Sequence, residues 1–131
     1  MKILALKNGT SLNCSNISKD IGVTDKTIKS WVSILQASGI VYLLQPYSSS
    51  EVKRMTKMPR IIFMDSGLAS HLAGFESADA LQKSKYNGSY FEAYVISEII
   101  KGYNNKGKRI DISYIRNDDS DEIDAVICKN G

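Results

Sequence analysis

The sequence predicts an α+β protein built in two parts, residues 1–64 and 65–131. Three observations carry this prediction. Two short helices flank a tight turn between Ser15 and Gly39, two β-prone segments follow them, and a long amphipathic helix precedes two more strands. A chain of 131 residues suits one compact domain or two small ones.

The net charge of +3 is unevenly divided along the chain. Residues 1–64 hold nine Lys or Arg and three Asp or Glu, a balance of +6, whereas residues 65–131 hold eight and eleven, a balance of −3. A basic first part fits a polyanionic partner, and an acidic second part fits cation binding. Ordinary variation of surface charge is the alternative explanation.

Composition favours a cytoplasmic protein with no membrane partner. Hydrophobic residues make up 43% and charged residues 24%, as in ordinary globular proteins. No apolar run approaches the ~20 residues of a membrane helix, and the first residues lack the apolar core of a signal peptide. Cys14 and Cys128 lack metal-binding spacing, so we expect reduced thiols and no metal or disulfide there.

The segment from Ser15 to Gly39 has the pattern of a helix-turn-helix. Gly22 is placed to end the first helix in the left-handed region, and the Thr24 hydroxyl is placed to cap the second. In the second helix the i, i+3, i+4, i+7 spacing predicts a buried face of Ile28, Trp31, Val32 and Leu35. The opposite face carries Lys26, Ser30 and Ser33, with Lys29 beside them. A cationic, hydroxyl-rich face on the second helix is typical of a helix that enters a DNA major groove.

A basic connection between two strands follows the helix pair. Ile40–Tyr47 and Met58–Asp65 are predicted strands, and helix, turn, helix, strand, basic loop, strand is the order of a winged helix. The basic residues in or beside the wing are Lys53, Arg54, Lys57 and Arg60. We expect them to contact DNA phosphates, although a solvated hairpin tip has the same composition. Asp65 is then predicted to cap a short helix.

Glu92 lies in an unusual place in the long helix of the second part. A stripe through Phe91, Val95 and Ile99 predicts the buried face, and Glu92 falls in the middle of it. A carboxylate there must be paired, protonated or bound to a cation, because its desolvation alone is costly. We favour a metal site over an ion pair with Lys or Arg. His71 has no acidic, Cys or Ser partner nearby in sequence and is expected to be structural or superficial.

Two strands joined by the acidic turn DDSD are predicted near the end of the chain, over 109–117 and 122–131. Alternation places Asp124 on one face with Val126 and Cys128, where it is partly buried. Residues Lys129 to Gly131 have the composition of a turn that leads to another strand, so the sequence has the character of a fragment.

The three segments FMDSGLASHLAG, GSYFEAYVISEII and YIRNDDSDEIDAVI, in this order, resemble the C-terminal region of bacterial and archaeal predicted AAA-type ATPases. In that group a winged helix follows the ATPase core, and a domain of unknown function similar to PD-(D/E)xK nucleases ends the chain. The resemblance covers about Ser15 to Gly131. It implies a winged helix-turn-helix over 1–64 and a truncated restriction-endonuclease-like α/β domain over 65–131.

The resemblance also assigns roles to individual residues. Glu92 matches the acidic residue of the first core helix, Asp124 that of the second core strand, and Arg116 the basic residue before the hairpin. In an active member the two carboxylates are catalytic and help to hold a divalent metal, Mg²⁺, which lowers the pKa of a bound water. The Glu-x-Lys of the motif is missing, so we do not expect this chain to cleave DNA.

The phosphate-binding motif GxxxxGK(S/T) is also missing, and the chain by itself should not bind ATP. The resemblance places the ATPase domain, with its ATP, upstream of Met1. Three functional hypotheses remain: duplex DNA binding as part of such an ATPase, a protein-interaction module that docks on the ATPase without binding nucleic acid, and a metal-dependent nuclease in a longer protein. The DNA-binding hypothesis assigns contacts to Lys26, Lys29, Ser30, Ser33, Lys53, Arg54 and Lys57.

Overall fold

The computed structural model describes residues 1–48, 58–116 and 121–129. Within these ranges the protein is mixed α+β, with six helices and a four-stranded sheet. The elements are α1 (Lys2–Leu6), α2 (Cys14–Ile21), α3 (Asp25–Ala37), β1 (Val41–Pro46), β2 (Arg60–Phe63), α5 (Ser66–Ala73), α6 (Ala78–Gln82), α7 (Asn87–Asn104), β3 (Asp111–Arg116) and β4 (Glu122–Cys128). Among the described residues, no helix combines the length and hydrophobicity that crossing a bilayer requires.

One sheet joins strands from both parts of the chain, in the order β2-β1-β3-β4. β1 is antiparallel to β2, with Val41 opposite Phe63, and parallel to β3, with Gln45 opposite Ser113. β3 and β4 form an antiparallel hairpin. The parallel pair requires a long crossover, which α5, α6 and α7 supply. The domain boundary at residue 64 stays a prediction, but the strands on either side of it are hydrogen-bonded to each other.

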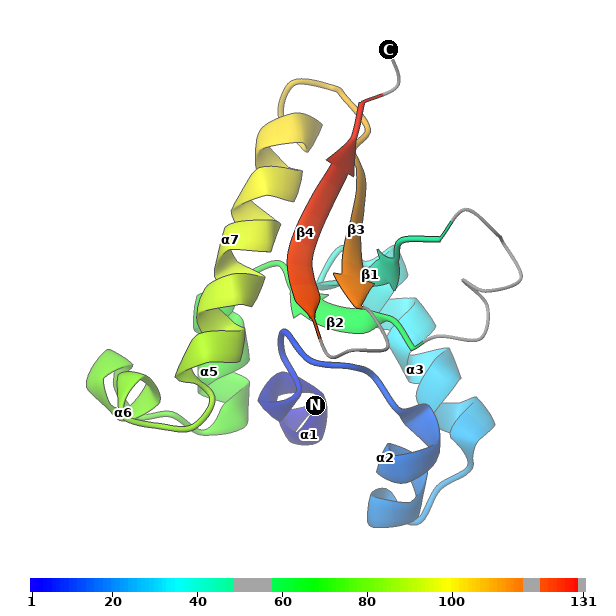
Figure 1. Ribbon diagram of the computed structural model, residues 1–131. Coiled ribbons are helices and arrows are strands. Elements are labelled where there is room, and N and C mark those ends of the chain that lie inside the picture. Colours follow the sequence, from blue (N-terminus) through cyan, green and yellow to red (C-terminus); the bar gives the residue numbers. More distant parts are fainter. Residues whose placement is uncertain (49–57, 117–120, 130–131) are drawn as a thin grey trace.

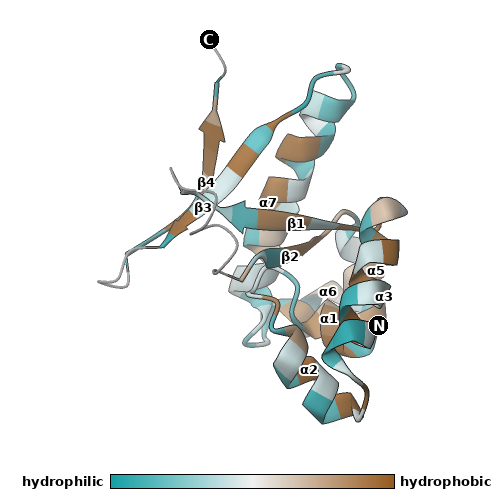
Figure 2. Ribbon diagram, turned by 90° about the vertical axis from the view of Figure 1, so that its right-hand side faces the viewer, coloured by the Kyte–Doolittle hydropathy of each residue, from teal (hydrophilic) through white to brown (hydrophobic). Residues whose placement is uncertain are grey.

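Alternation along β2 divides the apolar residues between two cores, and helices lie on both faces of this part of the sheet (Figures 1 and 2). Ile61 and Phe63 belong to a core shared with α1, α2, α3 and α5, whereas Ile62 belongs to a core under α7. The first core contains Leu4, Ala5, Leu12, Ile17, Ile28, Val32, Val41, Ile61, Phe63, Ala69, Ala73 and Tyr90. The second contains Leu44, Ile62, Ala93, Ile96, Ile100, Ile112 and Tyr114. The β1–β2 part of the sheet therefore has helices on both faces.

The predicted helix ends are confirmed. Gly22 follows α2 in the left-handed conformation, with φ of 81°. Thr24 Oγ1 accepts a hydrogen bond from Thr27 N at 3.2 Å and caps α3. Asp65 caps α5 in the same way, accepting from Leu68 N at 2.9 Å. These local contacts fix where α2 stops and at what point α3 begins.

The predicted buried face of α3 is wrong at Trp31, which is 46% exposed. Ile28 and Val32 are buried against the first core, and Leu35 is half-buried beside them. At about 100° per residue, Trp31 lies at the edge of this face, and no described element covers that edge. Ile34, further round the helix, is 60% exposed.

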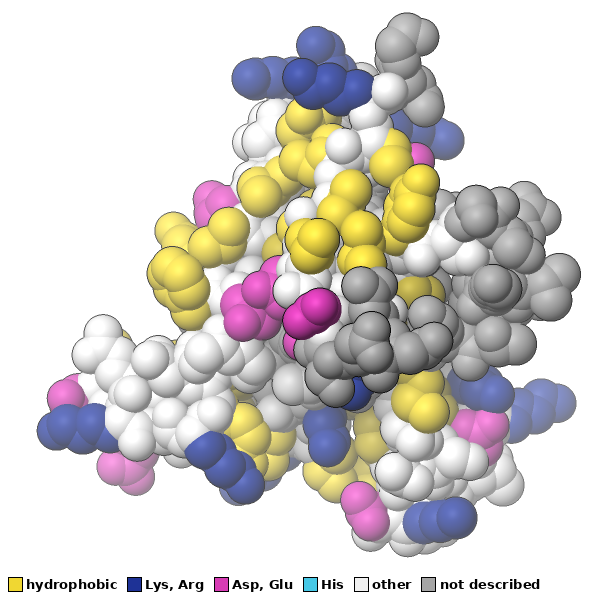
Figure 3. Space-filling view, viewed as in Figure 1, with side chains coloured by type: hydrophobic (Ala, Val, Ile, Leu, Met, Phe, Trp, Pro, Cys, Tyr) yellow, Lys and Arg dark blue, Asp and Glu magenta, His cyan; other side chains and the backbone are white. Residues whose placement is uncertain are grey.

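The predicted buried stripe of α7 is wrong at Phe91 and Val95, whereas Ile99 of the same stripe packs against the second core. Phe91 is 66% exposed and Val95 39%, while the buried side chains are Tyr90, Ala93, Ile96, Ser97 and Ile100. The first core lies on the Tyr90 side of α7. Tyr90 belongs to this core, and its Oη donates to Ala5 O at 2.7 Å. Exposed apolar side chains of α7 and β4 instead form a patch along both elements, visible in yellow in Figure 3.

The residues that follow α1 approach the beginning of α7 closely. Gly9 has φ of 82°, and a Cβ on this residue would lie 2.2 Å from Ser89 O. Gly9 N also donates to Ile61 O at 2.8 Å. Only glycine fits this contact without movement of the backbone.

Candidate functional site

The solvent-facing side of α3 carries three of the residues predicted to contact DNA. Lys26, Ser30 and Ser33 are exposed and lie opposite Ile28 and Val32, which pack into the first core. Ser33 Oγ donates to Lys29 O at 2.9 Å, so this hydroxyl already has a partner in its own helix. The helix thus presents one polar face, held in place by the buried face behind it.

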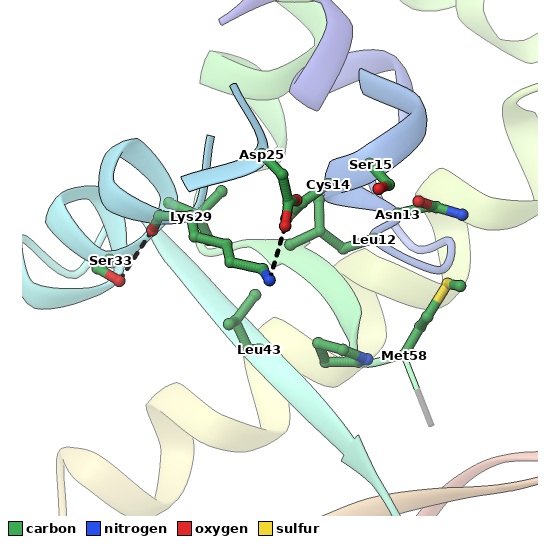
Figure 4. Close-up of a pocket in the computed structure, with 11 residues that line it drawn as sticks. Leu12, Asn13, Cys14, Ser15, Asp25, Lys29, Ser33, Leu43 and Met58 are labelled. Carbon is green, nitrogen blue, oxygen red and sulfur yellow. Dashed lines mark hydrogen bonds and ion pairs between the residues drawn. The ribbon is translucent and has the colours of Figure 1, made fainter. Parts of the chain in front are cut away.

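Lys29 contributes less positive charge to this face than the sequence suggests. Its ammonium lies 2.8 Å from Asp25 Oδ2, and Asp25 raises the pKa of Lys29 through this hydrogen bond and through its charge. Figure 4 shows Lys29 reaching toward Asp25 at a pocket of about 540 Å³. The pocket lies between the start of α2, α3 and the β1–β2 hairpin, with Cys14 and Leu43 in its wall. Both cysteines of the protein are free and half-buried.

Sequence reasoning missed the apolar part of the exposed α3 surface. Trp31 and Ile34 are three residues apart and therefore neighbours on the helix, and both are largely exposed. Ile34 was detectable from the sequence, because it falls outside the periodic set that begins at Ile28. Lys26, Trp31 and Ile34 thus give α3 an amphipathic outer surface.

Of the basic residues in or beside the predicted wing, only Arg60 lies within the described residues. Lys53, Arg54 and Lys57 lie outside the described residues, so their contacts with phosphate stay predictions. For Arg60 the prediction is wrong. Its side chain is only 6% exposed and pairs with two carboxylates of β4, so it is not free to contact a phosphate. The signal was present in the sequence, because strand alternation places Arg60 on the same face as the apolar Ile62.

Arg60 lies at the centre of a charged cluster that joins three strands. Its Nη1 is 3.2 Å from Asp124 Oδ1, and its Nη2 is paired with Glu122 Oε1, both on β4. The guanidinium carbon lies 4.5 Å from the ring centroid of Tyr114 on β3, a cation–π geometry. Tyr114 Oη donates in turn to Met58 O at 2.6 Å, just before β2. Acidic side chains gather where the lower end of β4 meets α7 in Figure 3.

Glu92 lies within electrostatic reach of this cluster. Burial raises the pKa of Glu92, the negative charge of Asp124 raises it further, and the guanidinium of Arg60 partly lowers it. The side chain is half-buried, at the margin of the α7 face that covers the sheet. The charge of Asp124 thus acts on Glu92, although the two residues are 32 positions apart in the sequence.

The arrangement does not fit the divalent metal that the resemblance implies. Mg²⁺ needs carboxylate oxygens that are free to point at it and a surrounding field that tolerates its charge. Asp124 Oδ1 already accepts from Arg60, and a guanidinium beside the site repels a second cation. In the described part of the chain, no group of three or more His, Cys, Asp or Glu side chains could hold a metal.

Two family models match the chain. A domain of unknown function, DUF8612, matches residues 1–79, and a second, DUF4143, matches residues 87–131. Arg60 lies in the first match, while its partners Glu122 and Asp124 lie in the second.

Two mycobacterial proteins are among the relatives that the chain resembles. "Uncharacterized protein Mb2031c" of Mycobacterium bovis and "Uncharacterized protein Rv2008c" of Mycobacterium tuberculosis are each 24% identical to the chain over 97 residues. The alignment covers 74% of this chain and 22% of each relative, so the chain matches about a fifth of their length. No solved structure gives a significant match. Because residues 1–79 are more than half of the 131, the chain belongs to the family of the domain of unknown function DUF8612.

Proposed function

We propose that this chain is a duplex DNA-binding module of a longer AAA-type ATPase. The observation that carries the proposal is the outer face of α3. This face exposes Lys26, Ser30 and Ser33, and Lys53, Arg54 and Lys57 lie in sequence between β1 and β2. The share of the curated relatives that the chain matches, 22%, supports a larger parent protein.

The order of the elements supports a winged helix for the first part. α1, α2 and α3 precede the β1–β2 hairpin, and a bridge between Ser11 and Arg60 adds a short third strand segment. In such a domain the second helix of the pair enters the major groove, where hydroxyl and ammonium groups meet base edges. Residues of the connection would contact phosphates and supply most of the affinity.

The charges on α3 determine how much of the DNA affinity comes from α3 and how much from the β1–β2 connection. Asp25 offsets the charge of Lys29, so Lys26 is the main cation that α3 offers to DNA. The three basic residues of the connection must then dominate binding, and the affinity should depend strongly on salt. Sequence preference, by contrast, should follow Ser30 and Ser33.

The experiment is a fluorescence anisotropy titration of a labelled duplex with the whole chain. We expect the triple variant Lys53→Glu, Arg54→Glu and Lys57→Glu to lose binding at moderate salt, because three phosphate contacts become repulsive. The matched control carries Lys106→Glu, Lys108→Glu and Arg109→Glu, where α7 leads into β3, away from α3 in Figure 1. Equal affinities of the two triple variants, or no binding by the wild type at low salt, would contradict the proposal.

A second function is favoured by the exposure of Trp31 and Ile34. An exposed Trp next to an exposed Ile is typical of protein interfaces, which are enriched in aromatic side chains. In this alternative, α3 docks on the ATPase region of the longer protein and binds no nucleic acid. The variant Trp31→Ser with Ile34→Ser should then lose capture by that region, whereas Lys26→Glu should keep it.

The nuclease-like assignment of the second part also stays a proposal. It is supported by the order α7, β3, β4 and by the proximity of Glu92 and Asp124. Metal-dependent cleavage stays a prediction about a longer protein. In this chain Asp124 is paired with Arg60, so we assign Asp124 no step of such a reaction.

A further inference from the structure

Among the described residues, Arg60 is the buried cation, and its environment compensates its charge. Its side chain is 6% exposed, whereas its partners Glu122 and Asp124 are 43% and 46% exposed. A guanidinium this deeply buried is stable only when carboxylates and a ring face replace the water that it has lost. The Arg60 side chain finds two carboxylates on β4 and the Tyr114 ring on β3.

Arg60 offsets part of the negative charge of the carboxylates that contact it. Glu122 and Asp124 together carry two negative charges against one on Arg60, and Glu92 nearby has its ionisation disfavoured. A divalent ion would have to take the Asp124 oxygen that Arg60 occupies, and it would also lie beside the guanidinium. Displacement of Arg60 would leave a buried, uncompensated positive charge.

From this geometry we infer that Arg60 is the resident cation of the acidic cluster, and that the cluster is a structural clasp rather than a metal centre. The clasp fastens β2, from the DUF8612 match, to β4, from the DUF4143 match. While it is formed, it excludes divalent metal. This inference does not depend on whether α3 binds DNA.

The clasp explains why Arg, and not Lys, suits this position. Two nitrogens of one planar guanidinium reach two different carboxylates, and the flat face of the same group stacks on Tyr114. A lysine ammonium is a point charge that cannot make all three contacts. Arg60 also follows Pro59, whose carbonyl is bonded to Leu12 N at 2.8 Å, so the start of β2 is anchored on its other side.

The first test is the stability of the whole chain with each carboxylate of the cluster removed. Asp124→Asn and Glu122→Gln should each lower the folding equilibrium constant about tenfold, because the charge of Arg60 loses a partner. Glu98→Gln is the matched control, since Glu98 pairs with Lys101 at 2.5 Å on the exposed side of α7. Cluster variants that are as stable as Glu98→Gln would overturn the inference.

The second test uses Mn²⁺ as a probe of the same site. Millimolar MnCl₂ should leave the melting temperature of the wild type unchanged, whereas Arg60→Met should gain stability from the ion. A wild-type melting temperature that rises with Mn²⁺, and no longer rises in Asp124→Asn, would overturn the inference. If Arg60→Met folds and its melting temperature does not change with Mn²⁺, the inference that Arg60 excludes divalent metal is overturned. If Arg60→Met does not fold, the wild type and the carboxylate variants still decide the question.

Discussion

Gly9→Ala tests how tightly the first part of the chain packs on the start of α7. Gly9 has φ of 82°, and a Cβ there would lie 2.2 Å from Ser89 O and 2.9 Å from Ser89 C. The left-handed conformation alone costs an L side chain about 1–2 kcal/mol. Because the obstructing atoms are backbone, relief of the overlap costs about 1–3 kcal/mol more. We expect the free energy of unfolding to fall by about 2–5 kcal/mol.

Gly22→Ala is the matched control for this substitution. Gly22 has nearly the same φ, 81°, but an added Cβ would meet no atom within 4 Å. It should therefore show only the conformational cost, about 1–2 kcal/mol. Urea unfolding followed by far-UV circular dichroism measures both losses, and their difference isolates the contact with Ser89. Equal losses for the two variants would refute the close approach of Gly9 to α7.

Three further substitutions probe other parts of the fold. Tyr90→Phe removes a buried hydroxyl that bonds to α1 and should cost about 1–2 kcal/mol in urea unfolding, whereas Tyr94→Phe, on the exposed side of α7, should cost nothing measurable. Thr24→Ala removes the cap of α3 and should cost about 1 kcal/mol by the same assay. Glu92 has a raised pKa, so its contribution to stability is present below the ordinary value of 4.5 and is lost as the pH rises through the raised value. Glu92→Gln should therefore raise the melting temperature at neutral pH, and the gain should vanish in acid; a constant gain at all pH values would contradict this.

Local signals in the sequence predicted the ends of the helices well. A glycine followed two positions later by a hydroxyl residue defines a stop and a start within five residues, and Gly22 and Thr24 behave accordingly. The strand segments were also placed correctly, because β-branched and aromatic runs bounded by turn residues have few other solutions. These features depend only on neighbours in the chain.

Contacts between distant residues were the part that sequence patterns did not resolve. A periodic pattern shows which residues of α7 are apolar but not which side of the helix the rest of the protein will cover. In the structure Tyr90 is buried, whereas Phe91 is exposed. The basic segment before Arg60 predicts a phosphate contact for it, whereas its carboxylate partners lie 62 and 64 positions later in the chain. Asp124 and Arg60 both act electrostatically on Glu92, and the catalytic pairing of the two carboxylates stays a prediction about a longer protein.

The most direct test of the proposed function is the salt dependence of duplex DNA affinity for the wild-type chain. Four phosphate contacts, from Lys26, Lys53, Arg54 and Lys57, predict that the logarithm of the binding constant falls with the logarithm of salt concentration with a slope of about −3.6. In the variant with Lys53, Arg54 and Lys57 changed to Glu, the slope should be about −0.9 or binding should be absent. A wild-type slope near zero, or the same slope in both proteins, would contradict DNA binding through α3 and the β1–β2 connection.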